Sequence, residues 1–520
     1  MTDTLELGVD AMVALGLYLA ATLSIGFLAR ARARDGSPVD YFLGGRATGA
    51  LVLFFTMQAT QYSGNAFFGF TGMGYRNGLI WILAVPLIGL IITAQLAFAP
   101  RLYVLSKRRN YITPADYYAD RYGSRGLRIV VAVLTIVSMF PYLMIQAEAT
   151  GHAVVGLTSG ALPFWSGVVF VSAIMAVYIS VGGWRGVVWT DAFQGVLLTI
   201  AMLAATGVIL RMAGGLDSVI ATLDRIEPSL LAAPDDPEVL TANWLSLLVV
   251  SAIGFAMYPQ AIQRVYAARS ERALKRGLTA MLLVPFALGA CTLLIGLSGA
   301  ALHPGLEGKA SDSVFALLLA DALQEHYWLV VFVLCGVLAA IMSTSSSVVL
   351  SLSSIFTRDI YHALLRPEAR PRELALAGRL FVSFILLLVV LASVNTTTTL
   401  WRLTEIKIEL LMQLFPPLVL GLYWRRASRS GAMLGLLSGT AVVAIMILTG
   451  HPRWWLFQAG LYGLFANLAV SVVAALVARE DPDAQMRIDR DFFMVFERAP
   501  DAAGRAQSGR SISNDSPITP

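Results

Sequence analysis

Apolar runs of about 20 residues recur along almost the whole chain, and this repetition limits the possible folds more than any other feature. An α-helix of that length crosses a hydrocarbon core about 30 Å thick, because each residue adds about 1.5 Å. We count thirteen candidate spans: residues 11–28, 50–73, 79–99, 129–148, 162–180, 191–210, 244–263, 279–302, 329–356, 374–395, 400–424, 431–448 and 454–477. The sequence therefore predicts an all-α polytopic membrane protein with about thirteen transmembrane helices.

The composition excludes a water-soluble globular protein of this size, because 57% of the residues are hydrophobic and only 14% are charged. The two cysteines, Cys291 and Cys335, lie inside apolar runs, where we expect them to pack as small residues rather than to form a disulfide framework. The first residues, MTDTLELGVDA, are acidic and lack the basic segment and cleavage site of a secretory signal. We therefore expect the first span to be retained.

Lysine and arginine collect in alternate loops, which sets the expected orientation in a cell membrane. The basic loops include Arg121 and Arg264, whereas the long loop at residues 211–243 carries six acidic residues. This pattern places the N-terminus outside and the C-terminus in the cytoplasm. The net charge of +5 then reflects cytoplasmic loops and indicates no nucleic-acid partner. Residues 479–520 are rich in Ser, Gly and Pro, so we predict a disordered tail.

Two spans are interrupted at corresponding positions. The second span carries polar side chains around Gly64: Gln58, Thr60, Gln61, Ser63 and Asn65. In the seventh span, Gly254 and Pro259 interrupt an apolar stretch. A helix breaks in lipid only where protein, water or a ligand takes up the freed backbone groups. Paired breaks favour a transporter built from inverted repeats with its binding site near the midplane, although such residues also allow close helix packing.

The ninth span contains five consecutive hydroxyl residues, from Ser343 to Ser347. Neighbouring hydroxyls at 343 and 344 point about 100° apart, with the carbonyl of Ala340 one turn below them. A broken second span beside this turn would add the carbonyls of Ala59 and Tyr62. Neutral oxygens in a dry pocket suit a small hard cation, and we predict sodium. The alternative is that the hydroxyls bond to carbonyls of their own helix, which we expect for these residues: Ser345, Ser346, Ser347, Ser351, Ser353 and Ser354.

Five motifs, in order, resemble the sodium:solute symporter family: DYFLGGRATG, GGWRGVVWTDAFQG, AIQRVYAARSERALKRG, AAIMSTSSS and LGLYWRRASRSGAMLGLLSG. The resemblance runs from about residue 40 to residue 429. It implies a five-plus-five inverted-repeat, LeuT-like core with flanking helices. We expect the following parts: an N-terminal helix and basic loop (1–49), the first repeat (50–210), an extracytoplasmic loop (211–243), the second repeat (244–424), two additional helices (425–478) and the tail (479–520).

The resemblance also implies where sodium, the co-transported ion, is bound. The family's site falls on the backbone oxygens of Ala59, Tyr62 and Ala340 and on the hydroxyls of Ser343 and Thr344. A further acidic residue, which the family associates with sodium release towards the cytoplasm, corresponds to Asp191. Because Thr190 and Asp191 open the sixth span, Asp191 is alternatively a helix N-cap with Gln194 nearby.

The family's substrate pocket lies around the break in the second span, which nominates these residues: Gln61, Ser63, Gly64, Gln146, Tyr258 and Gln260. Sugar-transporting members carry a lysine in the eighth span that is missing here, so a sugar is disfavoured. The eleventh span holds Arg402, Glu405, Lys407 and Glu409, and charges inside a membrane are by default functional. Glu405 is a further substrate candidate, and Lys407 or Arg402 could attract a carboxylate. The alternative is an internal ion-pair cluster.

These observations predict a symporter that imports a small organic acid or amino acid with sodium by alternating access. A sensor that binds solute without transport, and a sugar or vitamin symporter of the same family, are the alternatives. We expect no enzyme, because the chain has no GxxxxGK[ST] phosphate loop and its five histidines are dispersed. The expected partners are a small-molecule solute and the lipid bilayer, and the oligomeric state is left open.

Overall fold

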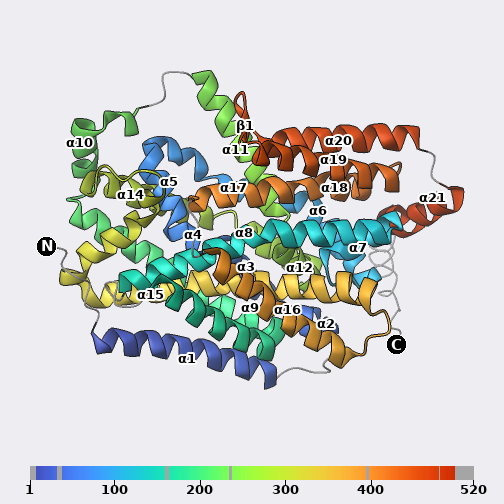
Figure 1. The fold of residues 1–520 in the computed structure, drawn as a ribbon, viewed down its shortest axis with the longest axis horizontal. Helices are drawn as coiled ribbons and strands as arrows, with labels where there is room; N and C mark the ends of the chain where they lie inside the picture. Colours follow the sequence, from blue (N-terminus) through green and yellow to red (C-terminus); the bar gives the residue numbers. More distant parts are fainter. Residues whose placement is uncertain are drawn as a thin grey trace, which may run out of the picture.

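The protein is a bundle of long helices. The computed structural model describes residues 8–31, 38–157, 163–232, 237–393, 398–478 and 481–497. In these ranges the strands are β1 (Arg453–Trp454) and β2 (Phe457–Gln458), which form a short antiparallel hairpin. Most long helices run along the long axis of the molecule, so the bundle has two ends (Figure 1). We name them after the short helices found there, the α10 end (Leu216–Ile226) and the α7 end (Pro114–Tyr122).

The described elements up to residue 232 are α1 (Val9–Ala31), α2 (Pro38–Leu43), η1 (Gly44–Arg46), α3 (Ala50–Gln61), α4 (Gly64–Phe67), α5 (Gly69–Asn77), η2 (Gly78–Ala84), α6 (Leu87–Arg109), α7, α8 (Arg125–Leu157), α9 (Phe164–Met212), α10 and η3 (Pro228–Leu230). The later helices are α11 (Pro237–Ala256), α12 (Pro259–Ala267), α13 (Glu271–Ala280), α14 (Val284–Leu302), η4 (Gly308–Ser313), α15 (Val314–Ile355), η5 (Phe356–Leu365), α16 (Pro371–Ser393), α17 (Leu400–Leu411), η6 (Met412–Leu414), α18 (Phe415–Tyr423), α19 (Arg429–Leu448), α20 (Ala459–Val477), α21 (Pro482–Ile488), η7 (Asp489–Phe493) and α22 (Met494–Glu497).

The predicted membrane spans correspond to helices. Within the described ranges, nine helices are long and apolar enough to cross a membrane, and α11 with α12 forms a tenth span bent by 49°. Three shorter apolar helices, Ala50–Gln61, Phe164–Met175 and Phe286–Leu302, fall in the second, fifth and eighth predicted spans. The prediction of an all-α polytopic membrane protein is therefore confirmed.

Both helices that the sequence predicts to be interrupted are broken. α3 ends at Gln61, Tyr62 and Ser63 have extended backbone, and α4 starts at Gly64. α11 ends before Tyr258, and Pro259 starts α12. Each break leaves carbonyl and amide groups without their helical partners in the protein interior.

Gly254 lets α11 lie directly against α17 near its break. A β-carbon at this position would lie 2.6 Å from both the Cβ atom and the carbonyl oxygen of Ile408. We expect Gly254→Ala to lower the melting temperature of the detergent-purified protein, because overpacking costs about 1–3 kcal/mol. Gly207 of α9 has no heavy atom within 4 Å of such a β-carbon, so Gly207→Ala is the matched control. Equal melting temperatures for the two variants would contradict the close contact.

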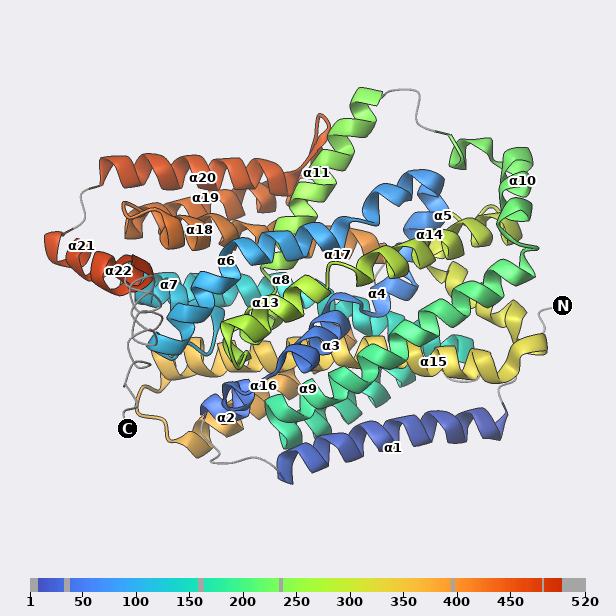
Figure 2. The ribbon, with the colours of Figure 1, turned by 180° about the vertical axis from the view of Figure 1, so that it is seen from behind.

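The hydroxyl-rich turn lies in the middle of the protein rather than in lipid. α15 is the most completely buried of the long helices, and α3, α8, α9, α12 and α16 pack around it (Figures 1 and 2). The residues of α15 from 333 to 355 are all buried. The oxygens of this segment therefore face other helices.

Two expectations for the α7 end are wrong. Arg121, which we counted in a basic loop, is fully buried on α7, where it donates from Nε to the carbonyl oxygen of Gly421 (2.9 Å) and from Nη2 to that of Trp424 (3.3 Å). The predicted tail is helical from α21 to α22. Arg487 donates to the carbonyl oxygen of Asp120 at 2.9 Å, so these helices dock on α7, whereas residues 498–520 lie outside the described ranges.

Candidate functional site

The hydroxyl pair of α15 faces the broken end of α3. Ser343 Oγ lies 3.1 Å from the carbonyl oxygens of both Ala59 and Ala340, and Thr344 Oγ1 lies 3.2 Å from that of Ala59. All four residues are fully buried. The structure therefore brings these oxygens of α3 and α15, two segments far apart in sequence, into one cluster.

This oxygen cluster has more acceptors than hydrogens. Ser343 has one hydroxyl hydrogen but two carbonyl oxygens at equal distance, and both hydroxyls share the carbonyl of Ala59. Ala59 belongs to the last turn of α3, where carbonyls lose their helical amide partners. Such a set of neutral oxygens suits a hard cation and does not suit transition metals, which prefer nitrogen and sulfur ligands.

Tyr62 lies at the same break, but its side chain turns away from the hydroxyl pair. Its backbone is extended, so its carbonyl is not part of a helix. Its ring lines a small cavity together with Trp81 and Thr292. The Tyr62 hydroxyl has no hydrogen-bond partner in the described part of the chain, so its side chain does not belong to the oxygen cluster.

The other serines of α15 divide into two groups. Ser345, Ser346 and Ser354 bond to carbonyls of their own helix, as we expected. The same expectation is wrong for three serines that donate to other elements: Ser347 to Asp191, Ser351 to Gln263 and Ser353 to Gly378. The serine hydroxyls of α15 therefore bond to neighbouring elements as well as to carbonyl oxygens of α15.

Asp191 is the centre of a second buried cluster. It lies in the second part of α9, eight residues after the non-helical kink at Gly183, so the N-cap interpretation is wrong. Its Oδ2 atom accepts hydrogen bonds from Arg264 Nη2 (2.6 Å), Thr56 Oγ1 (2.8 Å) and Ser347 Oγ (2.9 Å). Because Ser347 is one helical turn from Ser343, this cluster lies next to the oxygen cluster along α15.

Arg264 is a functional candidate that sequence reasoning missed, because it was assigned to a basic loop. It is fully buried on α12. Besides the ion pair with Asp191, its Nε donates to Thr56 Oγ1 at 2.9 Å, and its Nη2 donates to Ser347 Oγ at 2.7 Å. One guanidinium thereby joins α3, α9, α12 and α15. The available signal was its position directly after the predicted seventh span, residues 244–263, where an arginine can equally belong to a loop.

The predicted substrate residues on α4 and α8 lie beside the break. Gln146 Oε1 accepts the backbone N–H of Gly64 at 3.2 Å. One turn earlier on α8, Tyr142 donates to the carbonyl oxygen of Thr60 at 3.4 Å, and its ring centroid lies 5.3 Å from that of Tyr258. Both broken helices therefore meet α8 at the same place.

Several of these predicted substrate residues carry buried polar atoms that have no hydrogen-bond partner within the described part of the chain: Gln61, Gln146, Tyr258 and Gln260. Buried polar atoms of this kind cost free energy, so they indicate a polar ligand or water. Ser63 is different, because its hydroxyl caps α4 by accepting the N–H of Asn65 at 3.2 Å.

Glu405 is not brought together with the other predicted substrate residues. Its carboxylate accepts hydrogen bonds from Arg402 (2.8 Å), Arg453 (3.0 Å), Gln458 (3.0 Å) and Trp401 (3.1 Å). These contacts turn it towards β1, β2 and the start of α20. They match the ion-pair cluster that the sequence offered as an alternative to substrate binding by Glu405.

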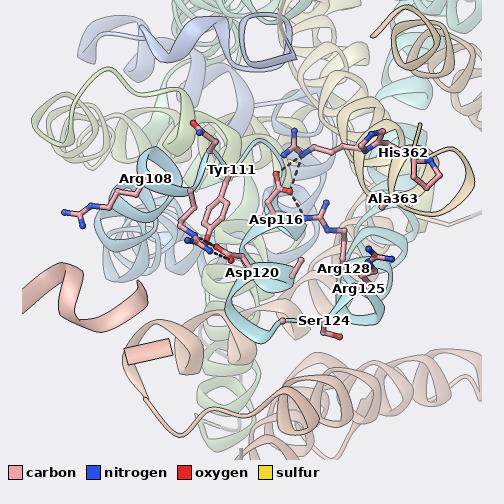
Figure 3. A pocket seen from close by; sticks show the side chains of 15 residues that line it. Arg108, Tyr111, Asp116, Asp120, Ser124, Arg125, Arg128, His362 and Ala363 are labelled. Atoms are coloured by element: carbon pink, nitrogen blue, oxygen red, sulfur yellow. Dashed lines mark hydrogen bonds and ion pairs between the residues drawn. The ribbon is translucent and has the colours of Figure 1, made fainter. Parts of the chain in front are cut away.

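A charged pocket opens at the α7 end (Figure 3). Asp116 forms ion pairs with Arg128 (3.0 Å) and Arg358 (3.1 Å), and Asp120 forms an ion pair with Arg109 (2.6 Å). Burial and the nearby Asp120 carboxylate raise the pKa of Tyr111, which donates to Asp120 at 2.6 Å. These pairs hold η5, the continuation of α15, against α7 and α8.

Comparison with known proteins gives consistent results over most of the chain. The sequence model of the sodium:solute symporter family matches residues 41–439. The osmoregulated proline transporter OpuE of Bacillus subtilis is 28% identical over 504 residues, covering 95% of this chain and 99% of the relative. The sodium/pantothenate symporter of Escherichia coli is 27% identical over 481 residues, covering 90% and 96%.

Solved structures show the same fold. A sodium-coupled sialic acid symporter in a substrate-bound outward-open state aligns with a TM-score of 0.73 and 20% identity, covering 91% of this chain and 98% of that one. The nucleobase-cation-symport-1 transporter Mhp1 in a closed conformation aligns with a TM-score of 0.55 and 14% identity, covering 88% and 99%. The expected LeuT-like fold is thereby confirmed.

Proposed function

Because the chain belongs to the sodium:solute symporter family, whose model covers residues 41–439, we propose that it imports a small organic solute together with sodium across a cell membrane. The oxygen cluster between α3 and α15 carries this proposal. Sodium binds there to the carbonyl oxygens of Ala59, Tyr62 and Ala340 and to the hydroxyls of Ser343 and Thr344. These are oxygen ligands from two elements of different repeats, residues 50–210 and 244–424.

Sodium binding couples to transport because the ligands lie on separate elements. An ion that contacts both α3 and α15 favours the conformation in which these two elements are adjacent. Solute binding at the neighbouring break then gains from the ordered backbone, and the coupling is reciprocal. Asp191 of α9 contacts Ser347, one turn further along α15, and its carboxylate provides the next binding position for sodium leaving towards the α7 end.

The α7 end faces the cytoplasm in this proposal, and the N-terminus faces outside. The basic residues of the charged pocket support this orientation, because lysine and arginine favour the cytoplasmic side. The ion pairs of Asp116 with Arg128 and Arg358 hold this end closed. Release of solute and sodium to the cytoplasm requires these pairs to separate.

The solute is a small organic acid or amino acid. The relatives are named for proline and pantothenate, and both compounds carry a carboxylate at neutral pH. The unpartnered side-chain atoms of Gln61, Gln146, Tyr258 and Gln260 supply donors and acceptors for the remainder of such a molecule. The pantothenate relative keeps a vitamin as the second candidate.

Uptake by reconstituted proteoliposomes tests the proposal. Radiolabelled proline, pantothenate, pyruvate and propionate are offered with an inward gradient of sodium chloride or of choline chloride. We expect at least one compound to accumulate above equilibrium with sodium only, and to leak out when gramicidin collapses the gradient. Sodium-dependent binding without accumulation would instead identify a sensor and overturn the proposed transport.

A further inference from the structure

A lysine side chain is buried in the middle of an aromatic cluster beside the two helix breaks. Lys407 of α17 is only 1% exposed. Its Nζ atom lies 3.6 Å from the ring centroid of Tyr142, 4.9 Å from that of Tyr258 and 5.0 Å from that of Phe255. We call this group of three rings the aromatic cage.

The ammonium has no negative partner in the described part of the chain. No hydrogen bond joins Lys407 to another described residue, and no described carboxylate lies within 4.0 Å of its Nζ atom. Cation–π attraction to the aromatic cage recovers only part of the hydration that a buried charge loses. A buried charge is therefore expected to meet an opposite charge at some stage of the working cycle.

The nearby acidic residues of α17 point the other way. Glu405 and Glu409 are each two residues from Lys407, which places them on the opposite face of the helix. Arg402 Nη1 lies 2.8 Å from Glu405 Oε2 and 3.8 Å from Glu409 Oε1. Gly460 of α20 packs against Glu409. One face of α17 thus carries the ion pairs of Glu405 and Glu409, and the opposite face carries Lys407.

That single cation borders the predicted substrate pocket. Tyr142 of the aromatic cage bonds to the carbonyl of Thr60 in the last turn of α3, and Tyr258 lies directly at the α11–α12 break. Gly254 allows α17 to approach this break closely, since only a hydrogen fits between it and Ile408. α17 therefore positions Lys407 where the two broken helices meet α8.

We infer that Lys407 binds the carboxylate group of the transported solute, with the aromatic cage excluding water around the ion pair. The inference rests on the proposed function and deepens it, because it selects solutes that carry a carboxylate. The free polar atoms of Gln61 and Gln260 then contact the rest of the molecule. A neutral analogue leaves the ammonium unpaired and binds more weakly.

Paired ligands test this inference on the full-length protein. Propionate, pyruvate, proline and pantothenate are each compared with their primary amide, using ligand-induced thermal stabilisation in sodium chloride to obtain dissociation constants. We expect at least one carboxylate to bind and its amide to bind about 10–100-fold more weakly. In Lys407→Gln, the affinity for the carboxylate falls by a similar factor and the preference over the amide disappears.

Two controls separate this result from general damage and from failure of the proposed function. Lys275 is an exposed lysine of α13, and Lys275→Gln is expected to keep the preference for carboxylates. Stabilisation by sodium chloride relative to choline chloride reports sodium binding and should survive in Lys407→Gln. Unchanged preference for the carboxylate in Lys407→Gln overturns the inference while leaving sodium symport intact, and so does a panel in which no carboxylate binds although sodium does.

A ligand-free measurement keeps the inference testable if Lys407→Gln is poorly produced. Lys407→Met replaces a buried, unpaired charge by an apolar side chain of similar length, so the melting temperature without added solute is expected to rise. A fall in melting temperature would identify Lys407 as a structural residue, and this outcome contradicts the inference.

Discussion

Replacing Ser343 and Thr344 together by alanine is expected to abolish sodium-stimulated uptake while the protein still inserts and folds. Both hydroxyls contact the carbonyl of Ala59, so the double variant removes two proposed sodium ligands from one side of the cluster. If each contributes as much as a hydrogen bond to a charged group, about 1.5–3 kcal/mol, sodium affinity falls at least about 100-fold. Sodium titration of uptake and of thermal stability measures this loss.

Ser345→Ala is the matched control for that experiment. Ser345 is also a buried hydroxyl of α15, but it bonds to the carbonyl of Ile341 in its own helix. Its removal should leave the sodium dependence unchanged. If the double variant of Ser343 and Thr344 retained the sodium dependence of the unmodified protein, the oxygen cluster would not be the coupling site.

Breaking the buried ion pair between Asp191 and Arg264 should have the largest effect on stability. Both side chains are fully buried and their charged atoms lie 2.6 Å apart. Asp191→Asn leaves a buried guanidinium without its counter-charge, and Arg264→Gln leaves a buried carboxylate. Loss of one partner of such a pair costs about 3–5 kcal/mol. We expect both single variants to lower the melting temperature of the detergent-purified protein strongly.

The double variant distinguishes the charge effect from lost packing. Asp191→Asn combined with Arg264→Gln restores neutrality, so its melting temperature should exceed that of either single variant. The exposed pair of Lys275 with Glu271 provides the comparison, and Lys275→Gln is expected to cost less than about 1 kcal/mol. Additive losses in the double variant would show that the two charges do not stabilise each other.

The sequence was most informative where polar residues interrupt apolar runs. Hydroxyls and amides in apolar runs identified Ser343, Thr344 and the break before Gly64, because lipid tolerates such groups only when they are satisfied inside the protein. The same reasoning located the break at Pro259, which has no amide to donate. The fold followed from run length and from ordered family motifs rather than from any single residue.

What sequence reasoning missed depends on long-range packing. Arg264 directly follows the predicted span 244–263, and Arg121 lies between the predicted spans 79–99 and 129–148. At both positions a buried guanidinium and a loop guanidinium have the same local sequence. Their burial depends on partners 73 and 300 residues away in the chain. Asp191 resembled a helix start because the predicted sixth span begins there, whereas the helix that carries it starts at the kink of Gly183, eight residues earlier.

Helix periodicity predicted that α17 has two different polar faces, but it did not predict how the helix is rotated in the bundle. Spacing alone puts Glu405 and Lys407 on opposite faces, yet it does not say which face meets the substrate pocket. We nominated Glu405, and the structure turns that residue towards Arg453 and Gln458. The deciding contact is between Gly254 and Ile408, which orients α17 and cannot be read from either segment alone.

The bonds of Arg121 have a consequence for biogenesis. Its carbonyl partners at Gly421 and Trp424 are synthesised about 300 residues later, which takes a ribosome roughly 15–60 s. During that interval the guanidinium has to stay in water at the membrane surface, so α7 can reach its final position only when α18 arrives. Chains that stop before residue 421 should accordingly expose α7 to proteases, and quality control can read that exposure as a sign of incomplete assembly.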